Sequence, residues 1–163
     1  MPYQKDRILT FLDPESDPLG AGWNITQAKI ALGSGGMSGK GFLQGTQAHL
    51  NFLPEQQTDF VFSVWAEEWG FVWVLVVLLL YLFALHRCYV VIGEAKDRFG
   101  VMLAVGCAAL LFWHIFINIA MVVGLFPVIG VPLPFMSYGG SSLLTFMIAV
   151  ALVINVRMRK YYF

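Results

Sequence analysis

Four polar side chains recur at every fourth residue just before a long apolar run: Glu55, Asp59, Ser63 and Glu67. On a helix each step of four residues advances by about 400°, so the four would form a slowly drifting stripe on one side. A carboxylate there can act as a general base or a metal ligand, and Asp59 is the foremost candidate. The plainer alternative makes Asp59 a helix cap, and Glu67 and Glu68 first-turn acids that complement the helix dipole. Spacing alone favours the capping alternative.

The glycine-rich stretch GSGGMSGKG, residues 33–41, looks at first like a phosphate-binding loop. It departs from that motif because Ser34 stands where the first glycine is required, and Gly41 follows Lys40 in place of Ser or Thr. We therefore exclude a nucleotide loop. The stretch could present Lys40 to an anionic head group, although its composition favours a solvated hinge.

A second turn-forming stretch, SYGGSS at 137–142, opens the last apolar run. Free backbone N–H groups at the start of a helix can bind an anion. Alternatively, a serine caps the helix while the glycines permit close packing. The residues leave these two alternatives open.

His114 and Asn118 lie four residues apart inside an apolar run and share a helix face. No acidic residue accompanies them at that depth. We therefore favour an interhelical hydrogen-bonding pair over a proton relay.

The chain has 163 residues, of which 58% are hydrophobic and 12% charged. Soluble domains carry about a quarter charged residues, so the composition predicts a membrane protein. A spanning helix needs roughly 20 apolar residues, and three runs approach that length: Phe71–Val91, Gly100–Leu125 and Leu143–Val156. The zero net charge argues against a nucleic-acid partner. Cys88 and Cys107 suggest neither a disulfide framework nor metal-ligand spacing.

Lys and Arg are concentrated in alternate connections. Residues 86–99 and the C-terminal tail each carry three, whereas 126–140 carries none. The positive-inside rule then places the first two in the cytoplasm, and 126–140 and 1–60 outside. Prolines and glycines in 124–141 exclude a regular helix and suggest a re-entrant loop. Near the start of the chain, Asn24 could cap a short helix that the glycines of GSGG at 33–36 end.

The predicted fold is an all-α polytopic membrane protein with about three transmembrane helices and an extracytoplasmic loop region with short helices. Its segments are a loop region at 1–59, an amphipathic entrance and first span at 60–92, a cytoplasmic turn at 93–99, a second span at 100–125, a re-entrant loop at 126–140, a third span at 141–156 and a cytoplasmic tail at 157–163.

Four sequence blocks together resemble a known family. They are PYQKDRILTFLDPESDPLGAGW, QAKIALGSGGMSGKGFLQGTQ, FLPEQQTDFVFSVWAEEWGF and GVPLPFMSYGGSSLL. In order and spacing they are similar to the C-terminal part of the SEDS family of bacterial cell-wall polymerases, and look more like its RodA-like elongation branch than its FtsW-like division branch. The resemblance covers nearly the whole chain. It implies that several further spans precede Met1.

This resemblance implies a peptidoglycan glycosyltransferase in the bacterial cytoplasmic (inner) membrane, crossing it several times with a cytoplasmic C-terminus. Its substrate would be lipid II, its partners a class B penicillin-binding protein and the lipid bilayer. The fragment alone would be inactive. Rival classes are a lipid II transporter and a non-catalytic scaffold for the penicillin-binding protein.

The family's essential acid matches Asp59 here, with Glu55 in the same block. A developing diphosphate charge must be neutralised by Lys or Arg or by a divalent cation such as Mg²⁺ or Mn²⁺. Lys40 and Arg7 are the first candidates, with Lys5 and Lys29 as substitutes. The other expected substrate-binding residues are Ser137, Gly139 and Gly140.

Overall fold

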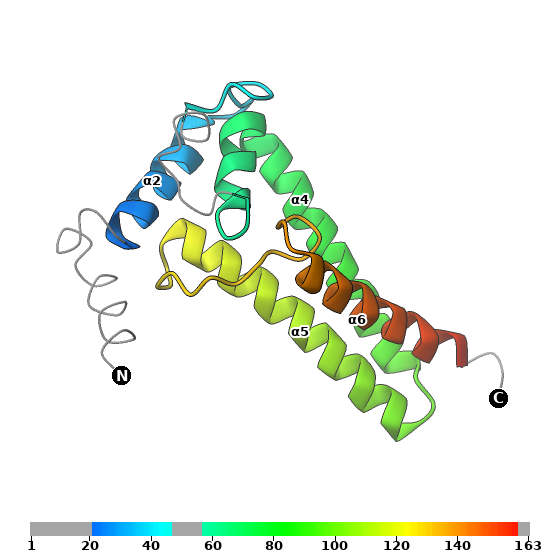
Figure 1. The fold of residues 1–163 in the computed structure, drawn as a ribbon. Coiled ribbons are helices and arrows are strands. Elements are labelled where there is room, and N and C mark those ends of the chain that lie inside the picture. Colours follow the sequence, from blue (N-terminus) through cyan, green and yellow to red (C-terminus); the bar gives the residue numbers. More distant parts are fainter. Residues whose placement is uncertain (1–20, 47–56, 160–163) are drawn as a thin grey trace, which may run out of the picture.

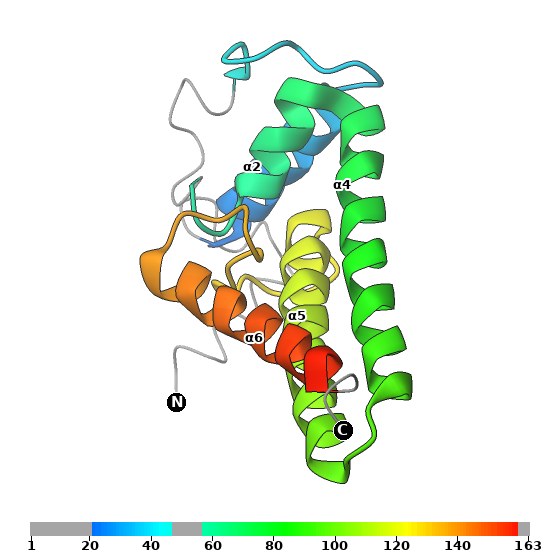
Figure 2. The same cartoon turned by 90° about the vertical axis from the view of Figure 1, so that its right-hand side faces the viewer.

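The structure is a computed structural model that describes residues 21–46 and 57–159. This part of the chain holds four helices and no strand: α2 (Ala21–Ser34), α4 (Val61–Glu94), α5 (Arg98–Val123) and α6 (Gly140–Arg159). In Figures 1 and 2 the long helices α4 and α5 run side by side, α6 lies against both, and α2 packs at the end where α4 begins. The predicted all-α architecture is confirmed for the described residues.

Helices α4, α5 and α6 are each long and apolar enough to cross a membrane. Their large apolar side chains are widely exposed, as at Leu80 (61%), Phe83 (62%) and Met102 (75%). A soluble surface does not carry apolar patches of this extent, whereas lipid accommodates them. The chain is therefore a membrane protein with three spans in its described part.

The helix ends differ slightly from the predicted ones. Helix α5 begins at Arg98, two residues early, because the Asp97 carboxylate accepts a hydrogen bond from the Gly100 N–H at 3.0 Å. It ends where Gly124 takes the left-handed conformation (φ 79°), which suits glycine. Helix α2 already includes Asn24, which is therefore not its cap.

Helix α4 is broken at Gly70, whose backbone (φ 78°, ψ −178°) is not helical. The break divides α4 into a short helix at 61–69 and a long span that follows it, and Figure 2 shows the change of direction. Glu67 and Glu68 thus lie just before the break, in the last turn of the short helix. The prediction that they are first-turn acids is wrong, because the helix begins only at Val61.

Two buried clusters hold the helices together. One joins α2, the start of α4 and the 124–139 connection, with Ala28, Phe62 and Leu133 among its members. The other joins the three spans, with Ala104 and Phe146 among its members. The first cluster fixes the 124–139 connection and α2 against the start of α4, where the candidate site lies.

Candidate active site at the start of α4

The turn at 57–60, which leads into α4, is bound to the 131–138 segment. The Tyr138 N–H donates to the Gln57 carbonyl at 2.8 Å. The Ser137 hydroxyl donates to the Thr58 carbonyl at 2.5 Å and accepts from the Leu133 N–H at 2.7 Å. Two hydrogen bonds therefore fix the backbone on the N-terminal side of Asp59, using residues about 80 positions further along the chain, and the third holds the Ser137 hydroxyl in place.

Asn118, on α5, holds the same turn from the other side. Its side-chain amide is fully buried and donates to the Asp59 carbonyl at 3.0 Å and to the Val131 carbonyl at 2.7 Å. His114, one turn earlier on the same face, lies with Nδ1 3.3 Å from the Pro132 carbonyl. The predicted shared face is confirmed, but these partners are backbone carbonyls of the connections and not another helix. The unwound, proline-rich segment supplies carbonyls that a helix would have used internally.

Asp59 itself is half-buried. A Cβ added to Gly130 would lie 3.1 Å from the Asp59 Oδ2, so the carboxylate faces the bare backbone of Gly130 (φ 79°). The N-cap position of α4 belongs to Phe60, one residue later. Asp59 therefore does not occupy the cap position that spacing alone favoured. Of the expected polar stripe, Ser63 and Glu67 lie on α4, and both are completely buried, whereas Asp59 precedes the helix.

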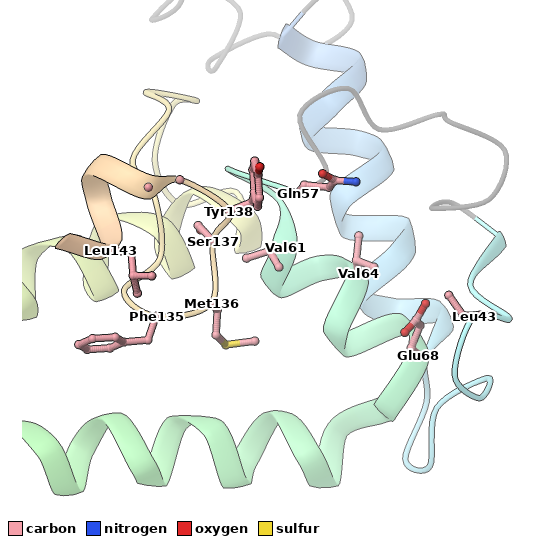
Figure 3. Close-up of a pocket in the computed structure, with 12 residues that line it drawn as sticks. Leu43, Gln57, Val61, Val64, Glu68, Phe135, Met136, Ser137, Tyr138 and Leu143 are labelled. Carbon is pink, nitrogen blue, oxygen red and sulfur yellow. The ribbon is translucent and has the colours of Figure 1, made fainter. Parts of the chain in front are cut away.

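Beside this turn lies a cavity of about 780 Å³, which we call the turn pocket. Figure 3 shows Gln57 and Tyr138 at one rim, Glu68 beside Leu43 at another, and Phe135 and Met136 on the wall. Asp59 is absent from its lining, although Gln57 and Val61 on either side of it line the pocket. The pocket combines a few polar groups with an apolar wall. That combination suits a ligand with a polar head and an apolar tail.

Three expected substrate-binding residues, Ser137, Gly139 and Gly140, all line the turn pocket. The residue before α6 is Gly139, and the Ser142 hydroxyl donates to the Gly139 carbonyl at 2.9 Å. The alternative in which a serine caps α6 is therefore wrong, because that hydroxyl donates and does not accept. The anion-binding alternative stays a prediction.

Glu67 is the most deeply buried charged side chain of the described residues, with 0% exposure. The Lys40 ammonium donates to its Oε1 at 2.6 Å. The same oxygen accepts from the Thr46 N–H and hydroxyl, both at 2.9 Å, and from the Ser34 hydroxyl at 3.4 Å. Lys40 thus already forms an ion pair with a carboxylate, and its expected contact with a substrate anion stays a prediction.

The glycine-rich stretch packs against the break in α4. The N–H groups of Lys40 and Gly41 donate to the carbonyls of Glu67 and Glu68 at 3.0 Å, and the N–H of Phe71 donates to the Gly36 carbonyl at 2.9 Å. Backbone groups that the break frees from the helix are satisfied in this way. Much of the stretch is exposed to solvent, as expected, but it is not a hinge, because it is hydrogen-bonded to α4.

The remaining expected residues are placed as follows. Lys29 is exposed on α2, against Gly124. Glu55, Arg7 and Lys5 lie outside the described residues. Within 21–46 and 57–159, no group of three or more His, Cys, Asp or Glu side chains could hold a metal ion.

Sequence reasoning missed two residues of this region. Glu68 lines the turn pocket, but its position next to an apolar run suggested only a dipole effect. Asn118 was noticed for its depth in the span, yet its partners are 13 and 59 residues away and no local pattern reports them.

Comparison with known proteins identifies the family of this chain. The profile of the FtsW/RodA/SpoVE family, described as "Cell cycle protein", matches residues 1–162. The chain belongs to this family. The resemblance found in its sequence blocks is thereby confirmed.

Among curated relatives, the peptidoglycan glycosyltransferase MrdB of Escherichia coli (strain K12) is 49% identical over 97% of this chain and 43% of its own length. The peptidoglycan glycosyltransferase RodA of Treponema pallidum (strain Nichols) is 45% identical over 98% of this chain and 37% of its own length. The chain thus spans about two fifths of the curated relatives it matches.

Solved structures agree with this placement. One, described as "Structural coordination of polymerization and crosslinking by a peptidoglycan synthase complex", matches 99% of this chain and 43% of the solved chain, with a TM-score of 0.76 and 34% identity. Another is an aspartate-to-alanine mutant of the Rod shape determining protein RodA of Thermus thermophilus. It matches 81% of this chain and 40% of its own, with a TM-score of 0.63 and 36% identity.

Proposed function

We propose that this chain forms part of a peptidoglycan glycosyltransferase that polymerises lipid II into glycan strands during cell elongation, with Asp59 as its general base. One observation carries the proposal. In this member of the family, the backbone at Asp59 is held by Asn118 from α5 and by the 131–138 segment, next to a pocket with polar and apolar walls. Such fixation holds the backbone that carries the carboxylate in one geometry, and positioning of this kind supports general-base catalysis.

The proposed reaction is an inverting glycosyl transfer. The Asp59 carboxylate takes the proton of the sugar 4-hydroxyl of an incoming lipid II. The oxygen of that hydroxyl then forms a bond to C1 of the growing chain, and the bond from C1 to undecaprenyl diphosphate breaks. Charge develops on this leaving group and must be stabilised by cationic side chains or backbone N–H groups. Arg7 and the backbone of Gly139 and Gly140 are the proposed contacts, and Glu55 is a proposed second acid.

In this proposal Lys40 acts indirectly. It neutralises Glu67 and thereby fixes the loop that carries Leu43 to the pocket rim. The expected divalent cation, Mg²⁺ or Mn²⁺, stays a prediction. The described residues supply no ligand cluster for one, so no step of the proposed reaction passes through a metal.

We place the turn pocket on the outer side of the bacterial cytoplasmic membrane. At the opposite end of the spans, Arg87, Lys96, Arg98, Arg157 and Arg159 gather near the α4–α5 turn and the end of α6 (Figure 1). Positive residues favour the cytoplasmic side. A class B penicillin-binding protein is the proposed protein partner, and the similarity to a chain of a peptidoglycan synthase complex supports it.

A transporter would need polar groups at membrane depth to accompany a diphosphate. Asn118 and His114 instead contact backbone carbonyls beside the site, and Asn155 is exposed on α6. In the described spans, these three side chains therefore do not line a continuous path. A scaffold would in turn have no need of a backbone turn held at three successive carbonyls next to an acid.

The test replaces Asp59 by Asn or Ala in the intact protein together with its penicillin-binding partner. Loss of a general base is worth about 10²- to 10⁴-fold in rate, so we expect lipid II polymerisation to fall by at least 100-fold. Glycan products separated on a gel give the readout, and co-purification of the partner shows that assembly is intact.

Glu94→Gln at the far end of α4 is the matched control and should leave polymerisation unchanged. If Asp59→Asn retains full synthesis, the catalytic role is excluded. If synthesis and partner binding are lost together, the scaffold alternative gains support.

A further inference from the structure

A groove of about 300 Å³ lies between α4 and α6, with α5 as its floor. We call it the α4–α6 groove. Apart from two arginines and a tyrosine, its lining is built from apolar side chains, among them Ala84, Val91, Leu111, Phe135 and Val153. Figures 1 and 2 show α6 lying against both α4 and α5, so that all three helices border this space. The groove is lined by no residue of the 57–60 turn, although it shares Phe135 with the turn pocket.

The two arginines come from different helices. Arg87 is exposed on α4 and Arg157 is half-buried on α6, and both line this groove. Neither forms an ion pair in the part of the chain that the structure describes, and no acidic side chain lines the groove. Two guanidinium groups beside an apolar channel therefore leave two positive charges without a partner. Their planar donors match phosphate well.

The length and the charge of the groove favour one class of occupant. Along α4 it extends from Tyr81 to Val91, about 15 Å at 1.5 Å per residue, which suits an extended acyl chain. The two arginines that line it favour an anionic head group on that chain over the apolar face of another helix.

We propose that the α4–α6 groove binds an anionic phospholipid of the bilayer, with an acyl chain among the apolar side chains and the phosphate on Arg87 and Arg157. Basic pockets between transmembrane helices bind anionic head groups in this manner. Its two arginines lie toward the end of the spans opposite the turn pocket, whereas Phe135 at its other end also lines the turn pocket. Occupancy of the groove can be measured apart from the glycosyl transfer proposed for Asp59.

The test measures phospholipid binding to the intact protein in phosphatidylcholine nanodiscs that contain increasing phosphatidylglycerol, with native mass spectrometry as the readout. We expect retained phosphatidylglycerol on the parent protein. Each arginine near a membrane surface contributes about 1 kcal/mol to anionic lipid binding, so Arg87→Gln/Arg157→Gln should raise the apparent Kd about 30-fold.

The double variant Arg98→Gln/Arg159→Gln is the matched control. It removes the same charge from exposed positions at the same end of the molecule, outside the groove lining. It should bind phosphatidylglycerol as the parent does. A second variant, Ala84→Phe, narrows the groove without changing charge and should also weaken binding. Thermal unfolding of each variant verifies that it is folded.

Three outcomes would overturn the proposal. Equal binding by the parent and the Arg87/Arg157 variant excludes the site, and an equal loss in the control variant shows a general surface-charge effect. Displacement of bound lipid by undecaprenyl phosphate at concentrations where phosphatidylglycerol does not displace it assigns the groove to a polyprenyl ligand.

Discussion

At the scale of single residues, the pair of Lys40 and Glu67 shows how the region around the site is held. A completely buried carboxylate is costly unless charge and hydrogen bonds compensate it. Here Oε1 accepts from Lys40, from Thr46 twice and from Ser34. The pair fastens the 33–46 loop to the last turn before the break in α4. Its role is to hold the loop in place, next to the pocket that the loop borders through Leu43.

Replacing Lys40 by Met should therefore destabilise the protein. Removal of one partner leaves a buried charge uncompensated, which costs about 3–5 kcal/mol, and the 28% exposure of Lys40 favours the lower end of that range. Thermal unfolding in detergent should show a lower Tm than that of the parent. Arg159→Met, at an exposed position of α6, is the control and should leave the Tm unchanged.

The double variant Lys40→Met/Glu67→Leu should recover part of the loss, because it removes the charge together with its partner. A Lys40→Met protein that is as stable as the parent would show that the ion pair does not hold the loop.

At the scale of elements, the break at Gly70 sets the direction in which α4 leaves the site. A Cβ at this position would lie 2.2 Å from the Gly39 nitrogen, and the positive φ of 78° disfavours any side chain. Gly39 is equally constrained from the other side, since its Cβ would lie 2.1 Å from the Glu68 carbonyl oxygen. Two glycines far apart in sequence thus allow a loop and a broken helix to meet through their backbones.

Gly70→Ala should disturb this junction. Strain of a non-glycine residue at positive φ costs about 1–3 kcal/mol, and the contact with Gly39 adds to it. We expect a clear fall in Tm, together with reduced polymerisation by the intact protein. Gly106→Ala, at a helical position of α5 with nothing within 4 Å, is the matched control. Helix propensity makes that change neutral or stabilising by up to about 1 kcal/mol. If both variants unfold at the same temperature, the junction is not what fixes α4.

At the scale of the whole molecule, polarity runs along the bundle. The described end with α2 and the turn pocket carries the Lys40–Glu67 pair, whereas the other end gathers arginines from all three spans. Between them the exposed surface is apolar. This division matches a bilayer with unequal faces.

The proposed orientation can be measured with single cysteines. Met37 is 71% exposed in the glycine-rich loop, and Met158 is 52% exposed near the end of α6. A membrane-impermeant maleimide added to intact spheroplasts should label Met37→Cys and leave Met158→Cys unlabelled until the membrane is permeabilised. Cys88 and Cys107 are buried and should give little background. Labelling in the reverse order would invert the orientation.

Much of this arrangement could be predicted from sequence, for a physical reason. Lipid requires about 20 apolar residues in a row, so the three spans could be located within a few residues. The acid at position 59 emerged from its sequence block and the family resemblance. The break at Gly70 could not be predicted, because it depends on hydrogen bonds to a loop about thirty residues earlier. The partners of Asn118 could not be predicted for the same reason, because they are brought together by the fold and leave no periodic pattern in the local sequence.

The amide at position 118 has a mechanical consequence. It is carried by a helix that crosses the lipid, yet it grips the turn that presents the carboxylate at position 59. Helices respond to bilayer thickness by tilting. A tilt of α5 would therefore be transmitted through this side chain to the turn at position 59, and bilayer thickness would then affect the reaction proposed there.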